Sequence, residues 1–323
     1  MAPEIGGYLG LERYGGSPYH RGAVALNSAR SCLAYLVELR GIRRVALPDL
    51  MCGAVGETCA QLGVEVRTYA VGEGLALPAD LEAAEGEWLY VADYYGRLGA
   101  GEVRRASAAS GGRLVVDEVQ GFFRPPWPGA DTVYTCRKFF GVPDGAYLVT
   151  GDGARLGRRL PPGSSRGRMA HVLGRSEAGS AAFYAAYREA EASLAREPLS
   201  EMSPVTESLL GAVDYGAARE RRERNYALLK EGLDGLNLLD TGSPTGPYMY
   251  PMLVEGAGGA RERLAARGVF VPTLWPEVLG ACGPSSWAHR YARDVLPLPV
   301  DQRYGEGDMQ IVIDAVKELP CLR

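Results

Sequence analysis

Short apolar runs alternate with segments of helical periodicity through the first half of the chain. The apolar runs, each of strand length, cover residues 23–27, 43–47, 64–70, 87–92 and 113–116. The helical segments cover residues 28–40, 52–62 and 102–110. Because the strands are apolar throughout rather than at every second position, they predict a parallel sheet that helices cover on both faces.

The next two strands are spaced differently. Residues 132–135 and 146–150 both have the character of strands, and only about ten residues separate them. A connection between parallel strands needs a dozen or more residues and is usually a helix. We therefore expect one antiparallel strand in a mostly parallel sheet flanked by helices, which makes the fold class α/β.

The second half of the chain begins with a change of composition. Residues 155–168 are rich in arginine, glycine and proline, which predicts an irregular exposed segment. Helices are then expected at 178–196, 215–236, 259–266 and 306–318, and strands at 250–254, 269–271 and 296–300. This pattern predicts a large domain over residues 1–215 and a smaller C-terminal α/β domain over residues 216–323.

Composition and charge narrow the range of functions. With 323 residues and 46% hydrophobic content, the chain can bury a sizeable core, which excludes general disorder. A net charge of −4 without a lysine-rich run provides no basic surface for nucleic acid or an anionic membrane. No apolar stretch approaches the ~18 residues of a membrane span, and the first residues lack a signal-peptide pattern, so we expect a cytoplasmic protein.

Cysteine and histidine are scattered along the chain. There are six cysteines and three histidines, and no C-x-x-C motif is present. We expect neither a metal site nor a disulfide framework. The cysteines are interpreted as small buried hydrophobic residues in a reducing compartment.

Lysine is rare in this chain. Only Lys138, Lys230 and Lys317 are lysines among 35 basic residues, and the last two lie in charge-rich helical segments typical of a solvated surface. Lys138 instead follows a strand and precedes Phe139 and Phe140. Apolar neighbours lower the pKa of a lysine amine, as a Schiff-base lysine requires, and arginine cannot replace such an amine. The alternative is a side chain whose stem covers the two rings while its ammonium reaches water.

Polar residues follow two other predicted strands. Ser28 lies between a strand and a helix; such a serine caps the helix, and the first amides of the helix can also bind a phosphate or carboxylate. No glycine-rich triphosphate or dinucleotide motif is present. Asp117 ends an apolar strand, either as a ligand or as a loop cap, and Gln120 either reaches the same ligand or faces solvent.

Taken together, these groups match the needs of one cofactor. An anion-binding helix start, an aspartate at a strand end and, about twenty residues later, a lysine in apolar surroundings are the groups that pyridoxal phosphate requires. The helix start binds the phosphate, the carboxylate keeps the ring nitrogen protonated, and the amine reacts with the aldehyde.

The ordered set resembles the fold-type I pyridoxal-phosphate enzymes, and most closely the DegT-type (DnrJ/StrS-like) aminotransferases. The similar segments are Asn27-Ser-Ala-Arg-Ser-Cys-Leu, Val45-Ala-Leu-Pro48, Val115-Val-Asp117-Glu-Val-Gln120, and Lys138 with Asp144-Gly-Ala-Tyr-Leu-Val. Weaker similarity continues in residues 221–225 and 295–299.

This resemblance implies roles for particular residues. Lys138 would bind the cofactor aldehyde and carry a proton between substrate and cofactor. Asp117 would pair with the pyridine nitrogen, and Gln120 would lie near the ring hydroxyl. The phosphate would be held by Ser28, Ala29 and Arg30.

Two departures from the family pattern lead to further assignments. Val133 stands where the family usually has a serine, five residues before the lysine, so we expect Thr135 to supply a hydroxyl to the phosphate. Most members also carry an aromatic ring after P-x-x-T, whereas this chain has Pro48-Asp-Leu-Met-Cys52. We therefore expect Cys52, Tyr94 or Tyr95 to cover that face of the cofactor.

The implied function is pyridoxal-phosphate-dependent transamination in two half-reactions. A glutamate-like amino donor and a keto or aldehyde acceptor, such as a keto sugar nucleotide, are the implied small-molecule partners. The implied assembly is a homodimer whose sites are completed across the two-fold interface. Arg290 and Arg293 are candidate contacts for a substrate carboxylate, or ordinary surface arginines.

Three alternatives to transamination remain open. The same cofactor supports lyase, racemase or decarboxylase chemistry, because the fold does not determine which bond breaks. A non-catalytic member of the family would bind the cofactor as a sensor or assembly subunit. An α/β enzyme without pyridoxal phosphate would make Lys138 incidental.

Overall fold

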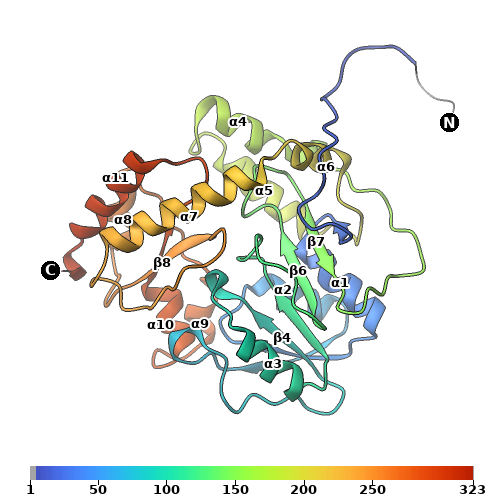
Figure 1. Cartoon of the computed structure of the whole chain (residues 1–323), viewed down its shortest axis with the longest axis horizontal. Helices are drawn as coiled ribbons and strands as arrows, with labels where there is room; N and C mark the ends of the chain where they lie inside the picture. Colours follow the sequence, from blue (N-terminus) through green and yellow to red (C-terminus); the bar gives the residue numbers. More distant parts are fainter. Residues whose placement is uncertain (1–4, 323) are drawn as a thin grey trace.

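A mixed sheet lies at the centre of the computed structural model, which describes residues 5–322 (Figure 1). Its seven strands have the order β1-β7-β6-β5-β4-β2-β3. They are β1 (Val24–Leu26), β2 (Arg44–Pro48), β3 (Glu65–Tyr69), β4 (Trp88–Ala92), β5 (Leu114–Asp117), β6 (Asp131–Thr135) and β7 (Ala146–Val149). Strand β7 is antiparallel to both of its neighbours, and the remaining pairs are parallel. The predicted mostly parallel sheet with one antiparallel strand is confirmed.

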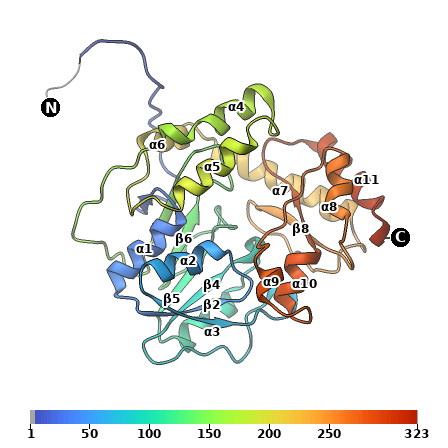
Figure 2. The same cartoon turned by 180° about the vertical axis from the view of Figure 1, so that it is seen from behind.

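Helices cover both faces of this sheet (Figures 1 and 2). On one face, Val115 of β5 packs in a cluster with residues of α1 (Ala29–Arg40) and lies near α2 (Gly53–Gln61). On the other face, Leu114 and Val116 pack in a cluster with residues of α3 (Ala100–Ala109). Because side chains alternate along a strand, Asp117 projects to the same face as Val115, toward α1 and α2.

The C-terminal part of the chain builds a second, smaller layer. Strands β8 (Met249–Leu253) and β9 (Val295–Pro299) form an antiparallel pair. Around this pair lie α7 (Tyr215–Gly232), α8 (Ala260–Ala266), α9 (Val278–Ala281), α10 (Trp287–Asp294) and α11 (Glu306–Lys317). A separate hydrophobic cluster fills this part, and another joins Leu50 and Tyr94 of the large sheet region to Val278 and Tyr291. The division into residues 1–215 and 216–323 stays a prediction.

Between the two parts, the chain forms α4 (Ala170–Ala178), α5 (Tyr184–Leu194) and α6 (Pro204–Gly211). The helix expected over residues 178–196 is present as α5 but begins later, at Tyr184. The preceding helix α4 was not predicted; it ends at Gly179, whose φ of +80° suits glycine and separates the two helices. Short 3₁₀ turns occur at Glu73–Leu75, Tyr94–Gly96, Arg166–Arg168 and Pro320–Leu322. No helix among residues 5–322 has the length and apolarity to cross a bilayer.

The strand expected at residues 269–271 is also wrong. This segment follows α8, and the N–H of Val269 donates to the carbonyl of Leu264 at the end of that helix. Val269 and Val271 are buried in the C-terminal hydrophobic cluster. Their apolar pattern therefore reflects packing of a loop rather than pairing in a sheet.

His20 is buried beside the first strand. Its Nε2–H donates to the carbonyl of Phe122 at 2.8 Å, and its ring stacks on Tyr134 with 3.7 Å between centroids. Burial lowers the pKa of His20 from 6.5 to about 4. The folded state therefore keeps this imidazole neutral in a pH range where the unfolded chain protonates it.

We predict that His20 makes the protein acid-sensitive between pH 6.5 and pH 4. The unfolded state binds the extra proton in this window, so folding stability is retained above pH 6.5 and lost as the pH falls toward 4. The shift corresponds to ~3 kcal/mol in the free energy of unfolding. Urea unfolding of wild type and His20→Gln at several pH values measures it, and parallel pH profiles for the two proteins would contradict the prediction.

Candidate active site

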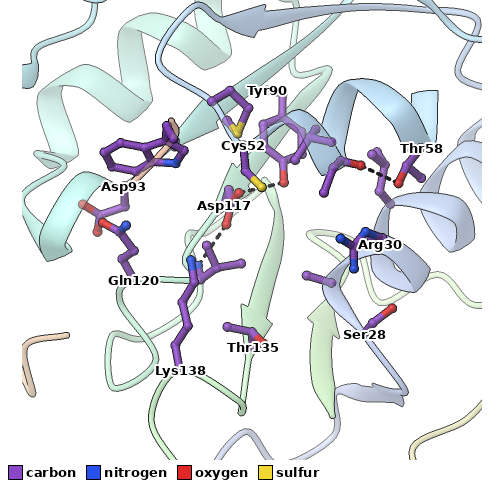
Figure 3. A pocket seen from close by; sticks show the side chains of 18 of the residues that line it. Ser28, Arg30, Cys52, Thr58, Tyr90, Asp93, Asp117, Gln120, Thr135 and Lys138 are labelled. Carbon is purple, nitrogen blue, oxygen red and sulfur yellow. Dashed lines mark hydrogen bonds between the residues drawn. The ribbon is translucent and has the colours of Figure 1, made fainter. Parts of the chain in front are cut away.

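One cavity at the carboxyl edge of the sheet collects most of the predicted site residues (Figure 3). Nine of the ten line it: Ser28, Ala29, Arg30, Cys52, Tyr94, Asp117, Gln120, Thr135 and Lys138. The cavity has a volume of about 170 Å³. It lies where β4, β5 and β6 end and where α1 and α2 begin, the usual ligand position in open α/β sheets.

The start of α1 forms one end of this cavity. Ser28 has an extended backbone, and its Oγ accepts a hydrogen bond from the N–H of Ser31 at 3.2 Å, which begins the helix. The Ala29 and Arg30 N–H groups belong to the first helical turn, which has no acceptors within the helix. Thr135 approaches from the end of β6, and within residues 5–322 its hydroxyl has no hydrogen-bond partner. Together these groups suit an anion.

Asp117 lies on the floor of the cavity as a buried carboxylate. Its Oδ2 accepts a hydrogen bond from the hydroxyl of Tyr90 at 2.8 Å, and its Oδ1 accepts one from the N–H of Val119 at 2.9 Å. Burial raises the pKa of Asp117, while the positive charge of Lys138 and these two hydrogen bonds act in the opposite direction. The side chain can thus accept a hydrogen bond from a cationic ring nitrogen.

Lys138 enters the same cavity from the segment after β6. Its Nζ lies 5.5 Å from the centre of the Tyr248 ring, and it forms no ion pair with another described residue. The side chain is accessible through the open cavity, but desolvation by the surrounding protein atoms still lowers the pKa of the Lys138 amine. The charge of Asp117 partly opposes this effect. Phe139 and Phe140 pack instead into an aromatic cluster with Phe122. The lysine therefore faces the cavity, apart from the rings that follow it.

Gln120 and the two tyrosines differ in how they meet the cavity. The Oε1 of Gln120 accepts a hydrogen bond from the Tyr95 N–H at 2.8 Å, which leaves its amide nitrogen free to donate. Tyr94 lines the cavity and donates its hydroxyl to the carbonyl of Leu50 at 2.5 Å. Tyr95 is the one predicted residue outside the cavity lining, because its φ of +60° turns the chain and its ring packs toward Trp275.

Several residues of the cavity were not singled out from the sequence. Tyr90, Asp93, Arg137 and Trp275 all line it. Tyr90 lies on the neighbouring strand of Asp117, a pairing that strand order alone would reveal. Trp275 comes from the C-terminal part, far away in the sequence, and no sequence pattern around it indicates a site. Its unusual φ of +55° becomes visible only in the structure.

The segment that carries Trp275 is held against the start of α2. The carboxylate of Glu277 accepts a hydrogen bond from the N–H of Gly53, and the Trp275 ring lies edge-on to Tyr94 with 5.5 Å between centroids. Through Trp275, the C-terminal part of the chain therefore supplies one wall of the cavity. A φ of +55° is strained for a bulky residue, and such strain is most often found at functional sites.

The two arginines considered as substrate contacts lie elsewhere. The guanidinium of Arg290 lies 5.3 Å from the Trp287 ring centre, and Arg293 pairs with Asp294 at 2.7 Å. Neither lines the cavity. Arg30 and Arg137 are the arginines that do.

No family model matches the sequence, and the search of curated proteins found no significant match. Solved structures do match. The sugar aminotransferase CalS13 from Micromonospora echinospora has 16% identity and a TM-score of 0.64, over 92% of this chain and 87% of that one. The aminotransferase TlmJ from Streptoalloteichus hindustanus has 19% identity and a TM-score of 0.64, over 94% and 91%.

A third solved structure carries the family name that the sequence suggested. It is a DegT DnrJ EryC1 StrS aminotransferase from Brucella abortus, with 14% identity and a TM-score of 0.62, over 91% of this chain and 85% of that one. At these identities the similarity shows the fold. The chain therefore has the fold of these aminotransferases, and the fold that the resemblance implied is confirmed.

We predict that the Lys138 amine reacts with a small aldehyde at lower pH than a free lysine does. Its pKa is lowered by burial, so a larger fraction is neutral and nucleophilic near pH 8. Reductive methylation with formaldehyde, followed by peptide mass mapping over a pH series, measures this with Nα-acetyllysine in the same solution. The exposed Lys317 checks that the reagent is active. A pH midpoint for Lys138 at or above that of Nα-acetyllysine would contradict the prediction.

Proposed function

We propose that this protein is a pyridoxal-phosphate-dependent aminotransferase. The observation that carries the proposal is the meeting of three groups in one cavity: the amine of Lys138, the buried carboxylate of Asp117 and an anion-binding helix start at Ser28. These groups come from three separate strand ends. The pKa of the Lys138 amine is lowered, two hydrogen bonds hold the Asp117 carboxylate in place, and the helix start offers N–H donors. The shared fold with solved sugar aminotransferases supports the same conclusion.

The residues of the cavity fit this cofactor. A cavity of about 150 Å³ can hold one benzene ring, so a cavity of about 170 Å³ admits a pyridine ring. The Nε of Arg137, a cavity-lining residue, is buried and has no acceptor in the described part of the chain, which leaves a donor for an anionic group. The donors cluster at the α1 end and the carboxylate lies at the end of β5, as an aromatic phosphate ester requires.

The chain's own residues would orient the cofactor. Ser28, Thr135 and the first amides of α1 would bind its phosphate. Asp117, held by Tyr90, would accept a hydrogen bond from the protonated ring nitrogen, and the amide nitrogen of Gln120 would donate toward the ring hydroxyl. When bound, pyridoxal phosphate supplies an aldehyde for the amino group and a cationic ring that withdraws electrons from the substrate α-carbon.

Lys138 would carry the protons of the reaction. Its Nζ, whose pKa desolvation lowers, would accept a proton from the α-carbon of the amino donor and return one during the transfer. Tyr94 and Trp275 would form the wall that limits water at this end of the cavity. The negative charge of Asp117 raises the pKa of Lys138 and would favour its protonation between these two steps.

The proposed substrates follow from the same resemblance. We propose a glutamate-like amino donor and a keto or aldehyde acceptor, with a keto sugar nucleotide as the leading class. The likeness to CalS13, a sugar aminotransferase, supports this class. Lyase, racemase and decarboxylase reactions would use the same Lys138 and Asp117, but their turnover would not depend on an amino acceptor.

We also propose a cytoplasmic homodimer of a large and a small domain, divided near residue 215. Exposed apolar side chains on α4 and α5, among them Leu173, Tyr184 and Tyr187, support an interface there. All six cysteines are free thiols, in keeping with a reducing compartment. A solution mass of twice 34.6 kDa is expected from analytical ultracentrifugation, and a fully active monomer would contradict the dimer.

Lys138→Arg is predicted to lower amino transfer at least about a thousandfold, because arginine keeps the positive charge but cannot supply a neutral amine. Lys230→Arg is the matched control, since Lys230 is exposed and donates to the carbonyl of Gly242 outside the cavity. Conversion of glutamate to 2-oxoglutarate is measured with a keto sugar nucleotide as acceptor.

Three results would count against transamination. Equal rates for Lys138→Arg and Lys230→Arg would remove Lys138 from the reaction. Turnover of the amino acid that is the same with and without acceptor would place the protein among the lyases, racemases or decarboxylases. Wild-type protein that binds pyridoxal phosphate but changes no amino donor would identify a sensor.

Trp275 is predicted to report cofactor binding through its fluorescence, because it is the tryptophan that lines the cavity in the described structure. Pyridoxal phosphate should quench the emission of wild type, and Trp275→Phe should remove more of this quenching than Trp287→Phe does. Trp287 stacks on Tyr291 at 5.7 Å between ring centroids and lies outside the cavity, which makes it the matched control. Equal losses in the two variants would place the bound cofactor elsewhere.

A further inference from the structure

Two arginines line the cavity beside the groups that are proposed to bind the phosphate. Arg30 is the second residue of α1, and Arg137 lies between Thr135 and Lys138; both line the cavity. Arg30 forms neither a hydrogen bond nor an ion pair through its side chain with any residue in the range 5–322.

Arg137 is held from behind by a carboxylate. Glu191 of α5 forms an ion pair with its Nη2 and also accepts a hydrogen bond from its Nη1 at 3.4 Å. An arginine has five N–H donors, and this pairing uses one on each terminal nitrogen. The Nε–H is buried and finds no acceptor among the described residues. A buried charged donor without an acceptor is costly unless a ligand completes it.

The local charge is unbalanced in the same place. The first turn of a helix carries a partial positive charge, so a cation at Arg30 is unfavourable there by itself. Burial lowers the pKa of Arg137 to about 10, and the charge of Arg30 contributes in the same direction. Glu191 pairs with Arg137, and the charge of Asp144 also favours the guanidinium, while the charges of Arg30 and Arg168 oppose it. A group with two negative charges would restore the balance.

We infer that Arg137 and Arg30 form a two-guanidinium clamp, within one chain, for the dianionic phosphate monoester of the cofactor. Glu191 is a positioning residue: it pairs with the two terminal nitrogens of Arg137, Nη1 and Nη2, and leaves the Nε–H to donate to the phosphate. This inference rests on the proposed function and assigns part of the phosphate affinity to Arg137. Two guanidinium groups suit a phosphate because each presents planar, charge-assisted hydrogen bonds.

The rival role for Arg137 is structural. Its pairing with Glu191 joins the segment after β6 to α5. In the structural role, this connection between two elements is all that the ion pair provides. The two roles differ in what they predict for ligands that carry or lack a phosphate. A clamp discriminates between such ligands, whereas a structural ion pair changes the binding of both equally.

The experiment compares pyridoxal phosphate with pyridoxal, which differ only in the phosphate. Their dissociation constants are measured by equilibrium dialysis for wild type, Arg137→Met and Arg30→Met. Each variant is expected to reduce the preference for the phosphorylated form by about tenfold or more, because charged hydrogen bonds are lost. Pyridoxal affinity should change less than about twofold, which also confirms that the cavity is intact.

Arg158→Met is the matched control, since Arg158 pairs with Glu38 at 2.6 Å on an exposed surface away from the cavity. It should keep the wild-type preference. Arg137→Lys keeps the charge but loses the fork, and it is expected to recover only part of the preference.

Two outcomes overturn the inference, and they can be told apart. In the first outcome, Arg137→Met keeps the wild-type preference for pyridoxal phosphate over pyridoxal, and Arg137→Met and Glu191→Gln lose the same amount of stability in urea unfolding. This result would assign Arg137 a structural role and leave the proposed function standing. A wild-type protein that binds neither ligand would overturn the proposed function, and the clamp with it.

Discussion

Two ionisable side chains, Asp117 and Lys138, face one cavity at the carboxyl edge of the sheet. Burial disfavours charge on both: it raises the pKa of the carboxyl and lowers that of the amine. Their mutual attraction acts against burial, and two hydrogen bonds from Tyr90 and Val119 keep the carboxylate available as an acceptor. The cavity therefore holds an amine whose pKa is lowered and a carboxylate that is held in place as a hydrogen-bond acceptor. The proposed proton transfer needs both groups in one cavity.

The sheet explains how groups separated along the chain meet at this point. Asp117 pairs in register with Ala92 of β4 and with Val133 of β6, so the ends of the three strands lie side by side. Thr135 is two residues beyond Val133 and thus reaches past Asp117 toward α1. The antiparallel β7 then returns the chain directly, without a helix, and leaves residues 136–145 as a short loop that carries Lys138 over the strand ends.

The residues that sequence could identify are those with a strong local signal. Asp117 ends a continuously apolar strand, Ser28 begins a helix, and Lys138 is a rare lysine beside two phenylalanines. The local sequence around each of them is therefore enough to identify it as a candidate. The remaining members of the cavity depend on contacts between distant segments. Trp275 reaches Tyr94 across the boundary between the two parts of the chain, and Arg137 is held by Glu191 of a helix more than fifty residues later. The same limit explains residues 269–271, because a packed loop and a paired strand can share one apolar pattern.

The most direct test of the central claim is to trap the covalent bond between the cofactor and the chain. The protein is incubated with pyridoxal phosphate, reduced with borohydride, digested and examined by mass spectrometry. A single phosphopyridoxyl group on Lys138, reduced in amount by Asp117→Asn, is the expected result. A label confined to Lys230 or Lys317, or no label on any of the three lysines, would contradict the assignment of this cavity as a pyridoxal-phosphate site.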